Sequence, residues 1–190
     1  MKWYDAATGG NELATGDTFT TTPLTADSSF WAEALNSNTT SETGGRLIPT
    51  STDIGTVSTA SSPWGLSFDT TKDFTINSVD VYPSTTAGNL TVTLTDANYN
   101  SILTKIFPLP AGNKTTPATL NLNFNVLANN TYRLVTSQAP AMVREFASGH
   151  PGFPYAIGTV GSITGGTINS NPNTNSNVYY FFYNWGITHG

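Results

Sequence analysis

The residues best suited to binding chemistry gather in one segment, Met142 to Tyr155, with the sequence MVREFASGHPGFPY. Within a glycine- and proline-rich stretch it combines a guanidinium, a carboxylate, an imidazole and aromatic rings. The candidates are Arg144, Glu145, His150, Phe153 and Tyr155. A guanidinium can bond two sugar hydroxyls or one carboxylate in fork geometry, and an exposed ring can stack on a pyranose. The segment therefore predicts a carbohydrate site, in which Glu145 and His150 exchange hydrogen bonds with sugar hydroxyls.

A structural interpretation of the same residues stays open. Arg144 and Glu145 could bond locally to hold the loop, while Phe153 and Tyr155 close the end of a sandwich. Neighbouring residues of a straight strand point to opposite faces, so Arg144 and Glu145 are not expected to serve one surface.

Trp64 is a further candidate platform for a sugar ring, because it follows a Ser-Ser-Pro segment at the start of a predicted strand. A ring at such a position can be half exposed. Its phase with Leu66 and Phe68 would equally make it the first core residue of that strand.

Catalytic chemistry finds little support in the sequence, and we predict that the protein is not an enzyme. The neutral-pH bases are His150 and His189, and no Gly-rich phosphate loop, HExxH or GxSxG is present. The acids stand in no suggestive pair for glycoside hydrolysis. No cofactor is expected, although Asp53 and Asp73 lie in loops and could hold a structural Ca²⁺ with backbone carbonyls.

Composition narrows the class of partner and the compartment. The 190 residues carry a net charge of −5 with no Lys/Arg cluster, so nucleic acid is not expected as a partner. No apolar run approaches the roughly 20 residues of a membrane helix, so no membrane partner is expected either. The chain has no cysteine, which excludes disulfides and thiolate zinc sites. Abundant Thr, Ser, Asn and Gly with 12% aromatic residues is typical of a secreted or cell-surface all-β module.

The strand pattern predicts an antiparallel β-sandwich, jelly-roll-like, over residues 46–190. The segment Val178 to Ile187, VYYFFYNWGI, is apolar on both alternating faces and is predicted to be one central strand. Asp96 to Asn100 is predicted to be a hairpin loop. Phase changes between Ile76 and Val79, which indicates a bulge at Asn77-Ser78. The polar stretch Asn36 to Ser62 is interpreted as linker and irregular approach, which Ile54 and Val57 could anchor.

Residues 1–45 form a separate unit of short predicted strands. These are Lys2 to Asp5, Thr18 to Thr22 and Ser29 to Ala34, with Trp31 assigned to the core. The segments WYDAATGG, LATGDTFTT and PLTADSSFWAEA resemble the second half of Ig-like repeats of large secreted Bacteroidetes proteins. The resemblance implies a partial Ig-like unit within a longer multidomain chain.

The second unit resembles a β-sandwich module of secreted Bacteroidetes proteins. The resemblance rests on the order of GLSFDTTKDFTINSVDVYP, NLTVTLTDANYNSIL, TLNLNFNV, MVREF, GFPYAIGTVGSITGG and YYFFYNW. It implies a non-catalytic carbohydrate-binding module of a polysaccharide-degrading protein, with polysaccharide as partner. The alternative is a structural spacer or adhesin domain without a small ligand.

Overall fold

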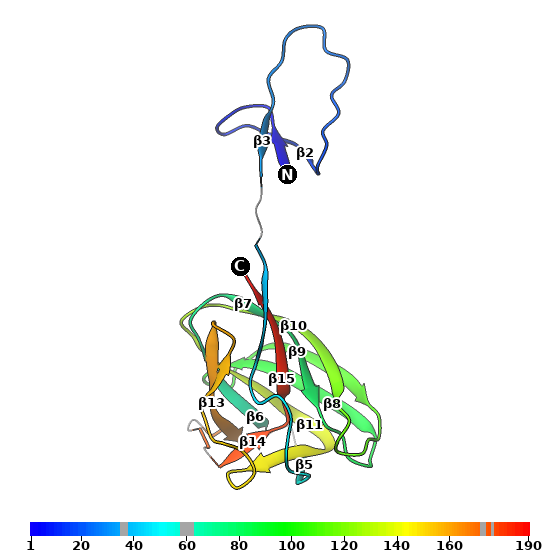
Figure 1. The fold of residues 1–190 in the computed structure, drawn as a ribbon, viewed down its shortest axis with the longest axis vertical. Coiled ribbons are helices and arrows are strands. Elements are labelled where there is room, and N and C mark those ends of the chain that lie inside the picture. Colours follow the sequence, from blue (N-terminus) through cyan, green and yellow to red (C-terminus); the bar gives the residue numbers. More distant parts are fainter. Residues whose placement is uncertain (35–37, 58–62, 172–173, 176) are drawn as a thin grey trace. The chain divides into compact units, whose positions relative to one another are not determined.

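A computed structural model describes residues 1–34, 38–57, 63–171, 174–175 and 177–190, and all regular elements among them are strands (Figure 1). The all-β prediction is confirmed, and none of these residues forms a helix suited to crossing a bilayer. The chain divides into two compact units, Met1–Asn38 and Thr39–Gly190.

The first unit is a three-stranded antiparallel sheet in the order β2-β1-β3. Its strands are β1 (Lys2–Tyr4), β2 (Glu12–Thr15) and β3 (Trp31–Glu33). The predicted strand at Thr18 to Thr22 is wrong, because these residues are irregular. One face of the sheet carries Trp3, whose ring lies 5.8 Å from that of Phe19.

The assignment of Trp31 to the core is also wrong, since 39% of this residue is exposed. Trp31 pairs with Tyr4 across the strands and therefore shares its face, whereas Trp3 takes the opposite face. The alternation of a short strand allows either face to be the inner one, and the sequence around Trp31 did not decide between them.

The described residues of the second unit form twelve strands, which pair antiparallel throughout. They are β4 (Thr40–Gly44), β5 (Ile54–Val57), β6 (Trp64–Thr70), β7 (Phe74–Val81), β8 (Gly88–Asp96), β9 (Ser101–Leu109), β10 (Ala118–Val126), β11 (Thr131–Phe146), β12 (Tyr155–Ile157), β13 (Gly161–Ile168), β14 (Val178–Tyr180) and β15 (Tyr183–His189). Ten of them form one path in the order β10-β7-β15-β4-β12-β13-β6-β11-β8-β9, and β5 and β14 both pair with β11. The path bends into two layers, which is the predicted β-sandwich.

The core lies between the two layers and follows the alternation of the strands. On β8 the inward residues Leu90, Val92 and Leu94 are fully buried, and the β8–β9 hairpin turns at the predicted Asp96 to Asn100. The outermost strands β9 and β10 approach each other without pairing, and the Lys105 ammonium lies 5.9 Å from the Phe124 ring centroid.

The interpretation of Asn36 to Ser62 as linker is wrong for two segments. β4 pairs with both β15 and β12, and β5 pairs with β11, with Val57 buried. Residues 36–37 and 58–62 lie outside the described residues. The predicted boundary near residue 45 therefore falls just after a strand that belongs to the sandwich sheet.

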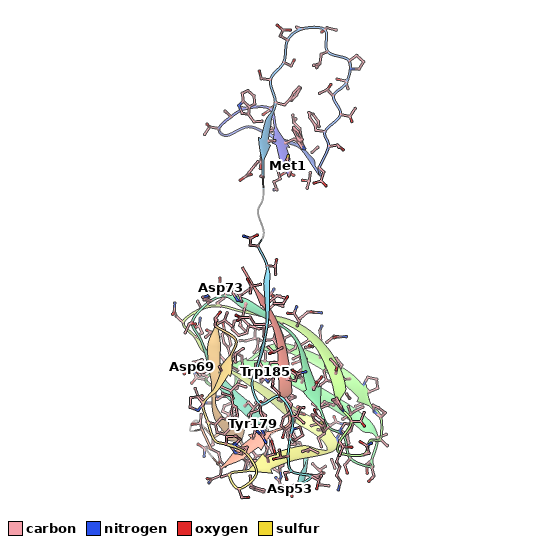
Figure 2. All side chains as sticks on the ribbon, viewed as in Figure 1. Met1, Asp53, Asp69, Asp73, Tyr179 and Trp185 are labelled. Carbon is pink, nitrogen blue, oxygen red and sulfur yellow. The ribbon has the colours of Figure 1, made fainter. Side chains whose placement is uncertain are left out.

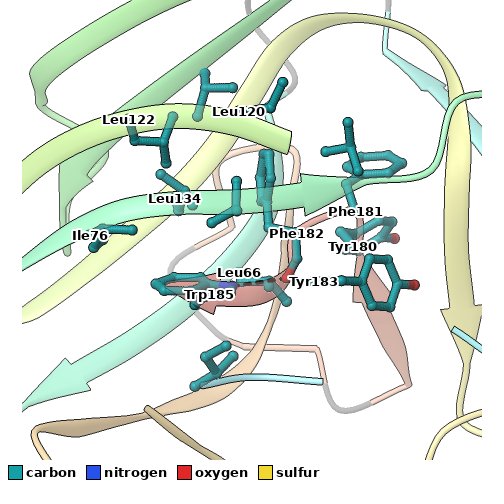
Figure 3. Packing of buried hydrophobic residues seen from close by; sticks show 14 of the residues in the cluster. Leu66, Ile76, Leu120, Leu122, Leu134, Tyr180, Phe181, Phe182, Tyr183 and Trp185 are labelled. Carbon is teal, nitrogen blue, oxygen red and sulfur yellow. Dashed lines mark hydrogen bonds between the residues drawn. The ribbon is translucent and has the colours of Figure 1, made fainter. Parts of the chain in front are cut away.

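The predicted single strand from Val178 to Ile187 is wrong in its continuity, because it is two strands. Phe181 has a positive φ of 70°, and the Phe182 amide donates to the Tyr180 carbonyl at 2.9 Å, as in a γ-turn. β14 then pairs with β11, whereas β15 lies between β7 and β4. The side chains are nevertheless core, as Figure 3 shows for Phe181, Phe182 and Trp185.

The bulge predicted in β7 is present. Relative to β15, residue Asn77 is the extra one, since Gly186 pairs with Ser78 and the next residue, Ile187, pairs with Ile76. This shift explains why the buried positions of β7 change phase along the strand.

Replacing Trp185 by alanine is expected to destabilise the second unit by about 3–5 kcal/mol. The indole is fully buried, lies 5.2 Å from the Phe68 ring, and donates to the Phe182 carbonyl at 2.9 Å. Urea unfolding followed by circular dichroism measures the loss. Ile106→Ala, on an exposed position of β9, is the matched control and should change stability little. An equal loss in both variants would contradict the core role of Trp185.

Candidate functional site

The end of β11 separates the predicted site residues onto two sides. Arg144 and Phe146 point to one side of the strand, and Glu145 points to the other, as the alternation predicted. The six candidates therefore do not form one constellation. Trp64 joins Arg144 on one side, while His150, Phe153 and Tyr155 join Glu145 on the other.

The first group, here called the Trp64–Phe146 surface, consists of Asp53, Trp64, Arg144 and Phe146. The Arg144 guanidinium carbon lies 5.6 Å from the Trp64 ring centroid and 5.0 Å from that of Phe146. Its Nε donates to Asp53 Oδ2 at 3.1 Å. Phe146 is 43% exposed, so an aromatic ring and a cation share one accessible surface.

Trp64 stands at the border between this surface and the core. Its ring lies parallel to that of Phe181 at 6.5 Å and 5.4 Å from that of Tyr180. Its Nε1 donates to Asn169 Oδ1 at 3.2 Å. A Cβ at Gly55 would approach Arg144 and Trp64 to 3.1 and 3.2 Å, so a glycine there leaves room for both side chains. Trp64 is half-buried, and its contacts with Phe181 and Tyr180 fit its interpretation as the first core residue of β6, while the platform role stays a prediction.

Glu145 is fully buried and bonds within the chain, which corrects the expectation that it meets sugar hydroxyls. Arg46 Nε donates to its Oε2, and Arg46 Nη2 donates to Oε1 at 3.1 Å. The Thr50 amide donates to Oε1 at 2.7 Å. Burial alone would raise the pKa of Glu145, but the hydrogen bonds from Arg46 and the amides outweigh it, and the pKa is lowered.

Arg46 also ties two loops together. Its Nη2 donates to the Gly149 carbonyl at 3.2 Å and to Thr50 Oγ1 at 3.1 Å. The segment after Arg46 and the segment after Glu145 are thus held against each other. This arrangement matches the alternative in which Glu145 holds the loop locally, although its partner is Arg46 and not Arg144.

His150 is buried as well, which corrects its expected contact with a ligand. Its Nδ1 lies 2.9 Å from the Tyr155 hydroxyl, and the Gly152 amide donates to Nδ1 at 3.2 Å. The Gly152 amide also lies 3.3 Å from the Tyr155 hydroxyl, so the imidazole, the hydroxyl and the amide form one hydrogen-bonded cluster. The rings of Phe153 and Tyr155 are half-buried and pack edge to face at 5.5 Å. Both also contact Tyr179, so they close this end of the sandwich.

Asp53 and Asp73, the two acids that the sequence offers for Ca²⁺, each contact another group of the protein. Asp53 pairs with Arg144, and Asp73 Oδ1 accepts from the Ala128 amide at 2.7 Å. Figure 2 places the two at opposite ends of the second unit, so they cannot share an ion. No cluster of three or more acids or histidines with metal-ligand geometry occurs among the described residues.

Comparison with known proteins identifies the N-terminal quarter of the chain. Residues 1–48 match the family model described as Ig-like domain, CHU_C associated. No curated protein matches the chain, and no solved structure matches it. The Ig-like resemblance of the first segment is confirmed, and it indicates an accessory or structural domain of an extracellular or surface protein. The match ends at residue 48 and gives no family for the rest of the sandwich.

We predict that Glu145→Gln destabilises the protein by about 3 kcal/mol, because it leaves the Arg46 guanidinium without a carboxylate in a largely buried position. For a unit of this size the melting temperature should fall by about 6–12 °C. Asp27→Asn, at an exposed acid of the first unit, is the control. A melting temperature for Glu145→Gln within the spread of that control would contradict the structural role.

The stability of the second unit should fall as pH is lowered from neutral. Burial lowers the pKa of His150 below the ordinary value of 6.5, the Asn177 backbone and the Glu145 carboxylate oppose this, and Arg46 adds to it. Between 6.5 and the lower folded pKa, the unfolded chain binds a proton that the folded chain does not. The free energy of unfolding therefore decreases through that window, by at most about 1.4 kcal/mol per pH unit, and then levels off.

Urea unfolding at pH 7.5, 6.5 and 5.5 measures this dependence. His150→Phe keeps the ring contacts with Phe153 and Tyr179 but cannot titrate, so its slope should be smaller. Ile106→Ala on β9, which removes no titratable group, is the control and should keep the wild-type slope. An unchanged slope in His150→Phe would show that another group causes the effect.

Proposed function

We propose that the second unit is a non-catalytic carbohydrate-binding module of a secreted bacterial polysaccharide-degrading protein. In this proposal Trp64, Arg144 and Phe146 contact the ligand. The observation that carries it is the exposed Phe146 ring beside a guanidinium that also lies over Trp64. Rings and a planar cation side by side match the apolar faces and hydroxyl edges of a sugar chain.

Each residue of the Trp64–Phe146 surface can contribute a contact to the ligand. Phe146 and the edge of Trp64 offer faces for pyranose C–H groups. Arg144 can donate to hydroxyls with the nitrogens of its fork that face away from Asp53. Asp53 can accept from hydroxyls with its remaining lone pairs. Of the six residues expected from the sequence, Trp64 and Arg144 keep a ligand role, while Glu145, His150, Phe153 and Tyr155 hold the loop beneath them.

Binding at this surface should be weak. A shallow, wet site exchanges sugar–water for sugar–protein hydrogen bonds at small net gain, and ordering the glycan costs part of that gain. A uronate carboxylate would compete with Asp53 for Arg144, and the net charge of −5 opposes anions at long range. Neutral and mildly acidic polysaccharides are therefore both reasonable probes.

The alternative is a spacer or adhesin domain that takes no small ligand. Two observations favour it: the Ig-like match of residues 1–48, and the ion pair with Asp53, which partly satisfies Arg144 inside the protein. An array of plant, algal and bacterial glycans separates the two functions. If no glycan binds at high micromolar protein concentration, the spacer function stands and the carbohydrate-binding proposal fails.

For any glycan that binds, Phe146→Ala and Arg144→Ala should each weaken binding about tenfold, since each removes a stacking face or a charge-assisted donor. Isothermal titration or affinity electrophoresis on the bound glycan measures the change. Ile106→Ala and Lys105→Ala on β9 are matched controls for an exposed apolar residue and an exposed cation, and should bind as wild type. Binding that survives both substitutions, in variants that keep the wild-type melting temperature, would place the site elsewhere on the unit.

A further inference from the structure

The first unit has a face that the proposed function does not use. Lys2 and Tyr4 of β1 share this face with Trp31 and Glu33 of β3, because Tyr4 pairs with Trp31 and Lys2 pairs with Glu33. The opposite face carries Trp3, near Phe19, which in turn lies 5.2 Å from Phe30. The sheet is thus apolar on one side and mixed charged and aromatic on the other.

The charges identify the second face as the outer one. Lys2 Nζ pairs with Glu12 Oε2 at 2.8 Å, and Tyr4 donates its hydroxyl to Glu33 Oε2 at 3.0 Å, both in exposed positions. A face that carries an ion pair and a second carboxylate is one that water covers. The exposed Trp31 indole is therefore a surface feature of the sheet and not an unpacked part of its core.

Trp31 borders a hollow of about 590 Å³ on this face. The hollow is lined by Tyr4, the turn from Ala6 to Gly10, and Trp31 to Glu33. Its volume falls within the roughly 300–1,000 Å³ of small-molecule sites. One wall is aromatic, another carries a carboxylate, and the third is backbone.

The backbone wall is held in shape by its own contacts. The Asp5 carboxylate accepts from the Asn11 amide at 2.7 Å and from Asn11 Nδ2 at 3.0 Å, which closes the turn. Gly9 has a φ of +67°, and a Cβ at Gly10 would come within 2.6 Å of the Ala6 amide nitrogen. Gly10 has no room for a Cβ, and the φ of Gly9 favours glycine, so these two residues present bare backbone to the hollow.

We propose that this hollow is a second carbohydrate site, specific for a neutral β-linked glucan, with Trp31 as stacking platform and Glu33 as hydroxyl acceptor. A β-linked glucose ring has equatorial hydroxyls, which leave flat C–H faces for an indole. Glu33 uses Oε2 for Tyr4 and can accept ligand hydroxyls with its remaining lone pairs. The ion pair between Lys2 and Glu12 cancels their charges. Asp5 and Glu33 therefore give this region a net negative charge, which disfavours anionic glycans.

This inference shares its ligand class with the proposed function but none of its residues. The proposed surface belongs to the second unit and uses a cation, whereas this site belongs to the first unit and uses a carboxylate. A chain with a site in each unit could hold one polysaccharide at two points and gain avidity without stronger single contacts.

The test is a titration of the full chain with cellohexaose, followed in ¹H–¹⁵N spectra. The four tryptophans give four indole signals, and Trp31→Phe and Trp64→Phe assign the two that matter. The Trp31 indole and the amides of Gly9 and Gly10 should shift together and saturate in the millimolar range. Glu33→Gln should raise the dissociation constant about 5-fold, because a charge-assisted acceptor becomes a neutral one.

Two controls separate binding from general changes in the unit. Trp31→Ala should abolish the shifts at Gly9 and Gly10, whereas Leu24→Ala, at another exposed apolar residue of the unit, should preserve them. Asp27→Asn, at an exposed acid outside the hollow, is the control for Glu33→Gln.

The outcomes are distinguishable from those of the proposed function. No shift of the Trp31 indole up to about 10 mM cellohexaose overturns the inference. A shift confined to the Trp64 indole overturns it too and supports the proposed surface. If neither the Trp31 nor the Trp64 indole signal shifts, the inference is overturned, and the glycan array still decides the proposed function.

Discussion

The carbonyl of Phe182 is the point on which the second unit depends. It accepts hydrogen bonds from the Tyr179 hydroxyl at 2.7 Å and from Trp185 Nε1 at 2.9 Å, both in the dry core. Either ring left without this acceptor would bury an unsatisfied donor. The shared acceptor fixes the break between β14 and β15 and sends one strand to β11 and the other to β7 and β4. β14 and β15 are thus joined through Phe181 and Phe182 alone.

That break also decides what the end of β11 can present. β14 pairs with Arg144 to Phe146, and this pairing keeps the last three residues of β11 extended. Extended residues alternate, so Glu145 goes inward to Arg46 while its neighbours go outward. The buried Arg46–Glu145 ion pair and the exposed Arg144 and Phe146 lie on opposite sides of β11. The buried contacts of Glu145 therefore fix the position of the outer residues.

The class and most strands followed from alternation, because the apolar residues of β8 and β10 recur at every second position and are the ones that are buried. Alternation did not show the turn at Phe181, since every residue there is apolar and a continuous strand has the same pattern. It also did not show that Glu145 finds Arg46 about a hundred positions away, which depends on the path of the sheet. Phe146 lies within the predicted segment, but a ligand role was not assigned to it, because the sequence does not indicate that a phenylalanine at a strand end is exposed.

The position of β15 has a consequence for how the protein is made. It is the last strand of the unit, yet it lies between β7 and β4, the latter being the unit's first strand. A chain that emerges from the ribosome N-terminus first holds β4 and β7 without their shared neighbour until residues 183–189 appear. Nearly the whole unit must leave the ribosome before its first strand can pair with β15. Pairing between strands so distant in the sequence forms slowly. Until then the inner face of one layer stays open.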